Sequence, residues 1–253
     1  MSVVINNVKN PIGRLGNQMF TLFLGKIISN HLNFQLSNLT INNILTNKDF
    51  ELHYNDITKQ KYDRPIQYLD HCNFNLTNIV EDKTPRKIIL DHFFQQKNMY
   101  LPYKKEIQKW SKISQYNIDA NDVGLHIRLD DLMHPTSLQH LLPLEYYINA
   151  IELLKPFDNL NIATDSITHP YIISLNKHYK CNIIQGTPKK TMDYLSNHNK
   201  LILSQGTFSF WIGFLSNAEK IINAVPKTGW NALSNKKEID LLIDAPNYIN
   251  IIL

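Results

Sequence analysis

The fold is decided by Leu125-His126-Ile127-Arg128-Leu129-Asp130-Asp131, an apolar strand that ends in one arginine and two carboxylates. In an open α/β sheet, ligands bind beyond the carboxyl ends of the strands. The guanidinium of Arg128 is planar and permanently charged, which suits phosphate oxygens at such an edge. A surface salt bridge with a following aspartate is the alternative for an isolated pair of this kind.

The rest of the second half alternates short apolar strands with helical segments. The pattern predicts strands over 160–164, 180–185, 200–204 and 220–225, and helices over 144–154, 191–198 and from about 206–209 to 215. Alternation at this spacing predicts a parallel sheet that is covered by helices on both faces.

The first half begins with a strand over 3–5, a glycine-containing loop over 10–18 and a helix from near Asn17 to Leu32. A further strand is expected over 87–90 and an amphipathic helix over 104–118, whereas 34–82 is polar and weakly periodic. A polar joint at 117–121 places the boundary between an amino-terminal domain, 1–120, and a carboxyl-terminal domain, 121–253.

Composition restricts the class of protein. The 253 residues are 43% hydrophobic and carry a net charge of +4, which is compatible with an anionic ligand but not with the clustered basicity of a nucleic-acid binder. Cys72 and Cys181 are too few for a disulfide framework, and we interpret them as buried free thiols. The amino terminus lacks a signal-peptide pattern and no apolar run approaches the ~18 residues of a membrane span, so a cytoplasmic protein is expected.

Polar residues also follow two other predicted strands of the second half. Arg128 suits a diphosphate, and the turn at 206–209 offers the hydroxyls of Thr207 and Ser209 and backbone N–H groups to phosphate oxygens. Asp165, followed by Ser166, has a carboxylate that can accept two donors, as the N1 and N2 edge of guanine requires. Each has a structural alternative: a helix N-cap for Thr207 or Ser209, a turn former for Asp165 and a core position for Phe208.

Two stretches of the first half have the composition of ligand sites. The loop with Gly13, Arg14, Gly16 and Asn17 comes before a helix, so backbone N–H groups and a positive dipole end could face an anion or a sugar. Aromatic residues beside amides, at 91–100, are typical of sites that stack on a sugar and bind its hydroxyls. An ordinary glycine loop and a half-buried loop are the alternatives.

Several motifs resemble those of the family 11 fucosyltransferases, the α-1,2-fucosyltransferase group. Residues 13–20 resemble its amino-terminal signature, and His126-Ile127-Arg128 with Asp131 resembles its His-Ile-Arg-Arg-Gly-Asp motif. Residues 207–211 are similar to its Ser/Thr-Phe-Ser-Trp-Trp segment, residues 93–100 to its Gly-Tyr-Phe-Gln-Ser-Glu-Lys-Tyr stretch, and 144–151 also fits. Residues 163–166 resemble the protein O-fucosyltransferases of the same superfamily.

The resemblance implies a GT-B fold, with two Rossmann-like domains facing a nucleotide-sugar crevice, and GDP-fucose bound in the carboxyl-terminal domain. It implies transfer of L-fucose with inversion to a glycan acceptor, for which the 2-hydroxyl of a galactoside is expected. The implied donor-binding residues are Gly13, Arg14, Gly16, Asn17, His126, Arg128, Asp165, Ser166, Thr207, Phe208 and Ser209. Phe94 and Gln95 are expected on the acceptor side.

The family works without a metal or another cofactor, which agrees with adjacent Asp130 and Asp131 in place of a spaced Asp-x-Asp pair. The chain departs from the family motif at Leu129, where a second arginine is expected, and at Asp130, where a glycine is expected. Arg128 is the expected catalytic cation, and Asp131 or Glu145 is the candidate general base. A transferase that uses another GDP-sugar, a nucleotide-sugar-binding protein without turnover, and a nucleic-acid binder are the alternatives.

Overall fold

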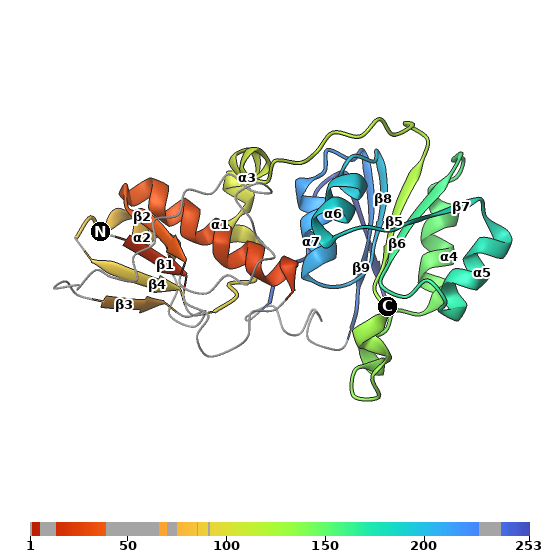
Figure 1. Cartoon of the computed structure of the whole chain (residues 1–253), viewed down its shortest axis with the longest axis horizontal. Helices are drawn as coiled ribbons and strands as arrows, with labels where there is room; N and C mark the ends of the chain where they lie inside the picture. The colour runs from red at the N-terminus through yellow and green to blue at the C-terminus, as the bar shows by residue number, and fades with distance from the viewer. Residues whose placement is uncertain are drawn as a thin grey trace. The chain divides into compact units, whose positions relative to one another are not determined.

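A computed structural model describes residues 2–5, 14–38, 66–69, 75–84, 86–90, 92–227 and 239–253. The chain divides into two compact units, Met1–Lys112 and Ile113–Leu253, which are described separately here. Figure 1 shows a parallel sheet with flanking helices in each unit. This arrangement confirms the α/β class that the sequence predicts.

The first unit is built around a four-stranded parallel sheet with the strand order β2-β1-β4-β3. Its elements are β1 (Ser2–Ile5), α1 (Leu15–Leu32), β2 (Gln35–Asn38), β3 (Ile66–Leu69), α2 (Leu76–Glu81), β4 (Lys87–Leu90), η1 (Lys97–Met99), η2 (Leu101–Tyr103) and α3 (Lys104–Trp110). The predicted strands at 3–5 and 87–90 and the helix from near Asn17 are confirmed.

Helix α1 is buried over most of its length because apolar side chains line most of its surface. It ends where Asn33 adopts a left-handed conformation with φ 53°. The expected helix over 104–118 is too long, since α3 ends at Trp110. Lys112 has a positive φ of 45°, which is incompatible with a continuing helix.

The second unit contains a six-stranded parallel sheet with the order β10-β9-β8-β5-β6-β7. Its elements are β5 (Val123–Ile127), η3 (Asp130–Met133), η4 (Leu138–His140), α4 (Leu144–Leu153), β6 (Leu160–Thr164), α5 (Pro170–His178), β7 (Cys181–Ile184), α6 (Pro188–Ser196), β8 (Lys200–Leu203), α7 (Thr207–Leu215), β9 (Lys220–Val225) and β10 (Tyr248–Ile252). Helices α4 and α5 lie on one side of the sheet and α6 and α7 on the other (Figure 1). The sequence predicted neither α5 nor β10.

The strand order reverses between β5 and β8, because the chain adds β6 and β7 on one side of β5 and β8 to β10 on the other. On the β6 side the ladder continues to the pair Ile127 and Thr164. On the β8 side the last pair is Leu125 and Ile202. The two strands therefore stop pairing early at their carboxyl ends, and a switch point of this kind is where open α/β sheets bind ligands.

At the opposite edge of the same sheet, a polar network joins Asn161 of β6 to Asp122, directly before β5, and to His198, two residues before β8. Nδ2 of Asn161 lies 3.0 Å from Nε2 of His198 and 3.4 Å from Oδ2 of Asp122. Burial lowers the pKa of His198, so its imidazole is neutral at pH 7. The ring packs against Gly124, where a Cβ atom would lie only 2.9 Å from Cγ of His198. This edge is closed by packing and hydrogen bonds.

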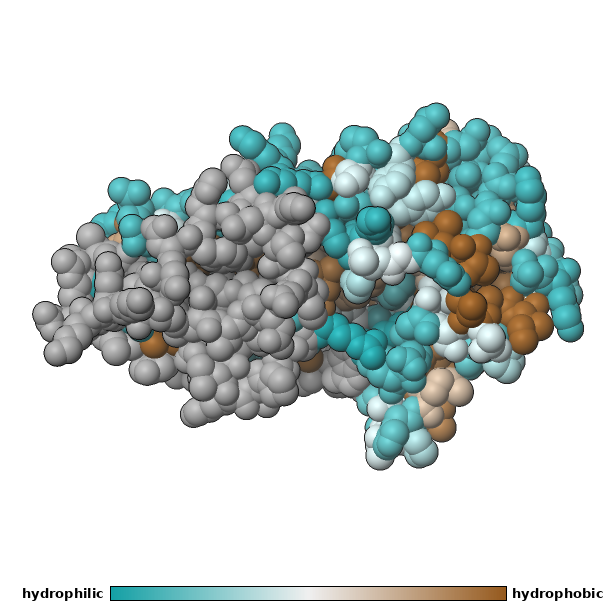
Figure 2. Space-filling model, in the orientation of Figure 1, coloured by the Kyte–Doolittle hydropathy of each residue, from teal (hydrophilic) through white to brown (hydrophobic). Residues whose placement is uncertain are grey.

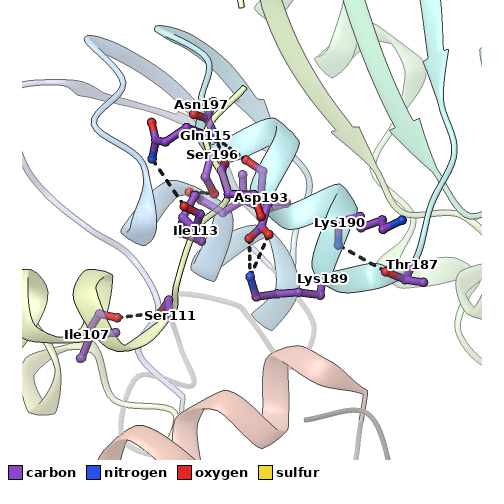
Figure 3. Close-up of polar contacts among 12 residues, drawn as sticks. Ile107, Ser111, Ile113, Gln115, Thr187, Lys189, Lys190, Asp193, Ser196 and Asn197 are labelled. Carbon is purple, nitrogen blue, oxygen red and sulfur yellow. Dashed lines mark hydrogen bonds and ion pairs between the residues drawn. The ribbon is translucent and has the colours of Figure 1, made fainter. Parts of the chain in front are cut away.

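The segment that follows α3 belongs with the second unit because it bonds to α6 (Figure 3). Asn197 donates from Nδ2 to the carbonyl of Ser114 over 2.9 Å, and its Oδ1 accepts the N–H of Tyr116 over 3.2 Å. The units therefore divide at residue 112, before the joint at 117–121 that the sequence singles out. In α6, Nζ of Lys189 donates to both carboxylate oxygens of Asp193 at 2.7 and 2.8 Å.

The face of the second unit that Figure 2 shows is mainly hydrophilic, with an apolar area over the part that carries α4 and α5. Leu153 and Ile173 are large exposed hydrophobic residues on these helices.

Cys181 is a half-buried free thiol whose pKa is raised to about 11 by burial, and Cys72 lies outside the described residues. In the described part of the chain, every helix is too short or too polar to span a bilayer.

Candidate functional site

Strand β5 and helix α7 bring His126 and Ser209 together at the reversal point of the second sheet. Nδ1 of His126 lies 2.6 Å from Oγ of Ser209, and its ring lies 5.2 Å from that of Phe208. Burial lowers the pKa of His126 to about 4, although the carboxylate of Asp165 opposes this shift. The imidazole is therefore neutral at pH 7 and acts as a hydrogen-bonding group that holds the start of α7.

Arg128 and Asp131 form a two-point ion pair beyond the end of β5. Nε of Arg128 donates to Oδ1 of Asp131 over 3.0 Å, and a terminal nitrogen donates to Oδ2 over 2.5 Å. The arginine side chain is 20% exposed and the aspartate 33% exposed. The guanidinium has five N–H donors, of which this carboxylate takes two. Asp131 therefore orients the arginine, and the salt bridge that the sequence analysis gave as the alternative is present.

Asp165, at the end of β6, contacts the turn that carries this pair. Its Oδ1 accepts the backbone N–H groups of Leu129, over 2.8 Å, and Asp130, over 3.0 Å. The next residue, Ser166, donates its N–H to Oγ1 of Thr164. The prediction that Asp165 lies near Arg128 is confirmed, and its carboxylate is engaged by the backbone.

Two residues that the sequence did not single out complete this edge. Oγ of Ser204, directly after β8, accepts the N–H of Arg128 over 3.4 Å and lies 2.9 Å from the hydroxyl of Tyr147. The neighbouring Tyr146 donates to the carbonyl of Leu203. Burial raises the pKa of Tyr147, so its hydroxyl stays protonated. Ser204 could have been identified from the sequence, because it is a polar residue directly after an apolar strand.

Helix α7 begins without a side-chain cap. Its N-cap is Gly206, with φ 108° and ψ 172°, so neither Thr207 nor Ser209 is the N-cap residue. Thr207 and Phe208 are half-buried in the first turn. Nε2 of the preceding Gln205 is buried and has no hydrogen-bond partner among the described residues. The first N–H groups of a helix need acceptors, and a bound anion supplies them well.

The first unit brings together two of the predicted residues. Nε2 of Gln95 donates to Oδ1 of Asn17 over 3.1 Å. Gly16 is buried in the first turn of α1 and Arg14 is exposed just before it, whereas Gly13 lies outside the described residues. Phe94 is fully buried in the core with a positive φ of 52°. Gln95 is therefore the polar candidate of the expected acceptor-side pair.

Leu129, one of the two departures from the family 11 motif that this stretch resembles, is fully buried in the core of the second sheet. Because the Leu129 side chain is packed in this core, it is not available to contact a ligand. Arg128 is therefore the arginine of the motif that remains for this role. Glu145 is exposed in the first turn of α4. No group of three or more His, Cys, Asp and Glu side chains is arranged to hold a metal ion within the described ranges.

The fold is similar to that of solved fucosyltransferases. A NodZ alpha-1,6-fucosyltransferase soaked with GDP-fucose matches with a TM-score of 0.57 and 12% identity over 92% of this chain and 96% of that one. The fucosyltransferase NodZ from Bradyrhizobium matches with a TM-score of 0.56 and 11% identity, over 92% and 95% of the two chains. A mutant of Arabidopsis thaliana FUT1 in complex with GDP matches with a TM-score of 0.50 and 13% identity, over 91% of this chain and 72% of that one. No protein-family model matches the chain, and no curated protein matches it.

Proposed function

We propose that this protein is a glycosyltransferase that moves L-fucose from GDP-β-L-fucose to a glycan hydroxyl, without a metal or another cofactor. The observation that carries the proposal is the arrangement of Arg128 and the uncapped start of α7 beside the reversal point of a parallel sheet. This combination offers a cation and the N–H groups of a helix start that has no side-chain cap to a diphosphate. The likeness in fold to enzymes that were solved with GDP or GDP-fucose supports this choice of donor.

The proposed reaction inverts the anomeric carbon. The acceptor hydroxyl oxygen bonds to C1 of fucose while the bond from C1 to the β-phosphate oxygen breaks. The electron pair of that bond leaves with GDP, and the hydroxyl proton passes to a base or to water. Negative charge therefore grows on the β-phosphate in the transition state, where preorganised donors are most effective.

The proposed roles follow from where the side chains lie. Arg128 stabilises the leaving diphosphate, and Asp131 holds the guanidinium in place through its two-point contact. The N–H groups and hydroxyls of Thr207 and Ser209 bind phosphate oxygens. Because the Ser209 hydroxyl has one proton, His126 holds it by donating from Nδ1 to Oγ. Loss of the Arg128 side chain should raise the barrier by about 2–4 kcal/mol, as for other charge-stabilising donors.

The role of general base falls to Glu145 rather than Asp131 under this proposal. Both oxygens of the Asp131 carboxylate already bind the guanidinium of Arg128, so proton uptake at Asp131 would disrupt this ion pair. Glu145 is exposed to solvent. With GDP as the leaving group, water can also take the proton.

The proposed product has a galactoside α-1,2 linkage, because residues 207–211 and 126–131 resemble the family 11 motifs.

Transfer from another GDP-sugar is the second candidate, and it rests on the buried Leu129 in place of a second phosphate-binding arginine. A protein that binds the nucleotide sugar without turnover would keep the same contacts around Arg128. Both alternatives are distinguished from fucosyl transfer by an assay in which GDP-fucose or GDP-mannose is supplied with galactoside acceptors. The product is identified by its mass and by NMR.

The first test is thermal unfolding of the wild-type protein with GDP, GDP-fucose, GDP-mannose, UDP or no ligand. A ligand at about 100 times its Kd adds about 2.7 kcal/mol of stability. At roughly 2–4 °C per kcal/mol for a chain of this size, the melting temperature should rise by several degrees. We expect the rise with GDP compounds and not with UDP.

The same measurement on Arg128→Ala should show a much smaller rise with the GDP compounds than the wild type shows. Lys177→Ala, which removes an exposed cation from α5, is the matched control and should behave as the wild type does. Equal stabilisation by UDP and GDP, or a wild-type protein that no nucleotide stabilises, would contradict the proposed donor.

A further inference from the structure

The carboxylate of Asp165 lies at the end of β6 and faces the backbone of the turn after β5. One of its oxygens, Oδ1, accepts the N–H of Leu129 at 2.8 Å and that of Asp130 at 3.0 Å. A carboxylate oxygen has two lone pairs, so these contacts use its full accepting capacity. Both bonds are charge-assisted and therefore stronger than those between neutral groups.

These bonds replace a strand ladder that has ended. The pairing of β5 with β6 stops at Ile127 and Thr164, and the pairing with β8 stops two residues earlier. Side chains take over from there: Ser204 accepts the N–H of Arg128, and Asp165 accepts the next two. Three successive amides, at 128–130, are thus held by side chains from the two neighbouring strands.

The turn fixed in this way also determines where the guanidinium lies. Asp130 and Asp131 begin η3, and the carboxylate of Asp131 binds the side chain of Arg128 at two points. A shift of the backbone at 129–130 moves Asp131, and the guanidinium must move with it. Asp165 therefore acts on the arginine through the backbone of this turn.

We propose that Asp165 is a positioning residue that clamps this turn and thereby sets the placement of Arg128 for the diphosphate. This inference rests on the proposed donor site but assigns Asp165 a different role from the reading of guanine. A carboxylate that reads guanine presents one oxygen to N1–H and the other to N2–H. Oδ1 is already saturated, so a guanine contact of this kind requires the clamp to break.

Asp165→Asn separates the two roles. Asparagine keeps an acceptor oxygen in the position of Oδ1, so it can hold the turn, but it places a donor amide where guanine needs a second acceptor. Asp165→Ala removes both functions. Asp158→Ala, which removes an exposed carboxylate from the loop before β6, is the matched control.

The affinity for GDP is measured by calorimetry on these variants and on each of them combined with Arg128→Ala. Removing a side chain that accepts backbone N–H groups, as an N-cap residue does, changes an equilibrium constant by about tenfold. Asp165→Ala should therefore weaken GDP binding about tenfold, and the affinity of Asp165→Asn should stay within about threefold of the wild type. In the Arg128→Ala background, Asp165→Ala should change the affinity less than about twofold, because coupled residues are not additive.

Equal loss of GDP affinity in Asp165→Asn and Asp165→Ala, or additivity with Arg128→Ala, would each overturn the positioning role. Hydrogen exchange of the amides at 129 and 130 tests the clamp without nucleotide. Exchange should be faster in Asp165→Ala and close to wild type in Asp165→Asn and Asp158→Ala. Unchanged exchange in Asp165→Ala would refute the clamp, whereas a wild type that binds no GDP but keeps this pattern would refute only the proposed function.

Discussion

The buried imidazole of His126 makes the stability of the second unit depend on acid pH. Its pKa is about 4 in the folded protein because burial penalises the charged ring, whereas the ordinary value is 6.5. The unfolded chain therefore binds more protons than the folded one between these two values. Stability from this group is fully present above pH 6.5 and is lost as the pH falls toward 4.

The size of the effect follows from the two pKa values. A shift of one unit corresponds to 1.36 kcal/mol, so the folded protein should lose about 2 kcal/mol of unfolding free energy between pH 7 and pH 5 through this residue. The loss should reach about 3 kcal/mol at pH 4. Other buried groups also titrate in this range, so the effect of His126 must be measured as a difference between variants.

The perturbation is His126→Asn, which keeps a hydrogen-bonding group near the position of Nδ1 for Ser209 but cannot take up a proton. Urea unfolding from pH 7 to pH 4 gives the free energy of each protein. We expect the variant to be less stable at pH 7 and the gap to close by about 2 kcal/mol at pH 5. His178→Asn, an exposed position on α5, is the control and should run parallel to the wild type. Parallel curves for wild type and His126→Asn would refute the argument.

Three further substitutions test the packing of the second unit. Gly124→Ala should cost about 1–3 kcal/mol in urea unfolding, because the new methyl group would overlap His198, while the folded fraction should bind GDP as the wild type does. Gly206→Ala should cost about 1–3 kcal/mol, since φ 108° and ψ 172° suit only glycine, and calorimetry should show weaker GDP binding as α7 changes its first turn. Lys189→Met leaves a carboxylate buried and should cost about 3–5 kcal/mol in urea unfolding, with a smaller loss when Asp193→Leu accompanies it.

The sequence predicted most of the second sheet because its strands are buried on both faces and read as short apolar runs. Strands at 160–164, 200–204 and 220–225 were found within one residue of their predicted bounds. Helix α5 was missed because its pattern is short and mixed, and β10 because it comes after a polar stretch. The helix at 104–118 was extended too far, since the left-handed turn at Lys112 has no glycine to mark it.

The candidate site was predicted in part. Polar residues after β5, β6 and β8 had to meet at one edge, and Arg128, Asp165 and Ser209 do lie there. Sequence spacing could not reveal which of them bond to one another. The contact of Ser204 with Tyr147 joins residues from a strand and a helix that are far apart in the chain, and it exists only because α4 packs beside β8.

The early end of the ladder between β5 and β8 has a consequence for how this sequence can change over evolutionary time. Beyond the last strand pair, backbone amides depend on Ser204 and Asp165 for acceptors, and these residues lie among the proposed ligand-binding groups. A substitution at either position alters folding and binding at once. In a mutational scan of every position, this edge should therefore tolerate few replacements, whereas the exposed faces of α4 and α5 should accept many.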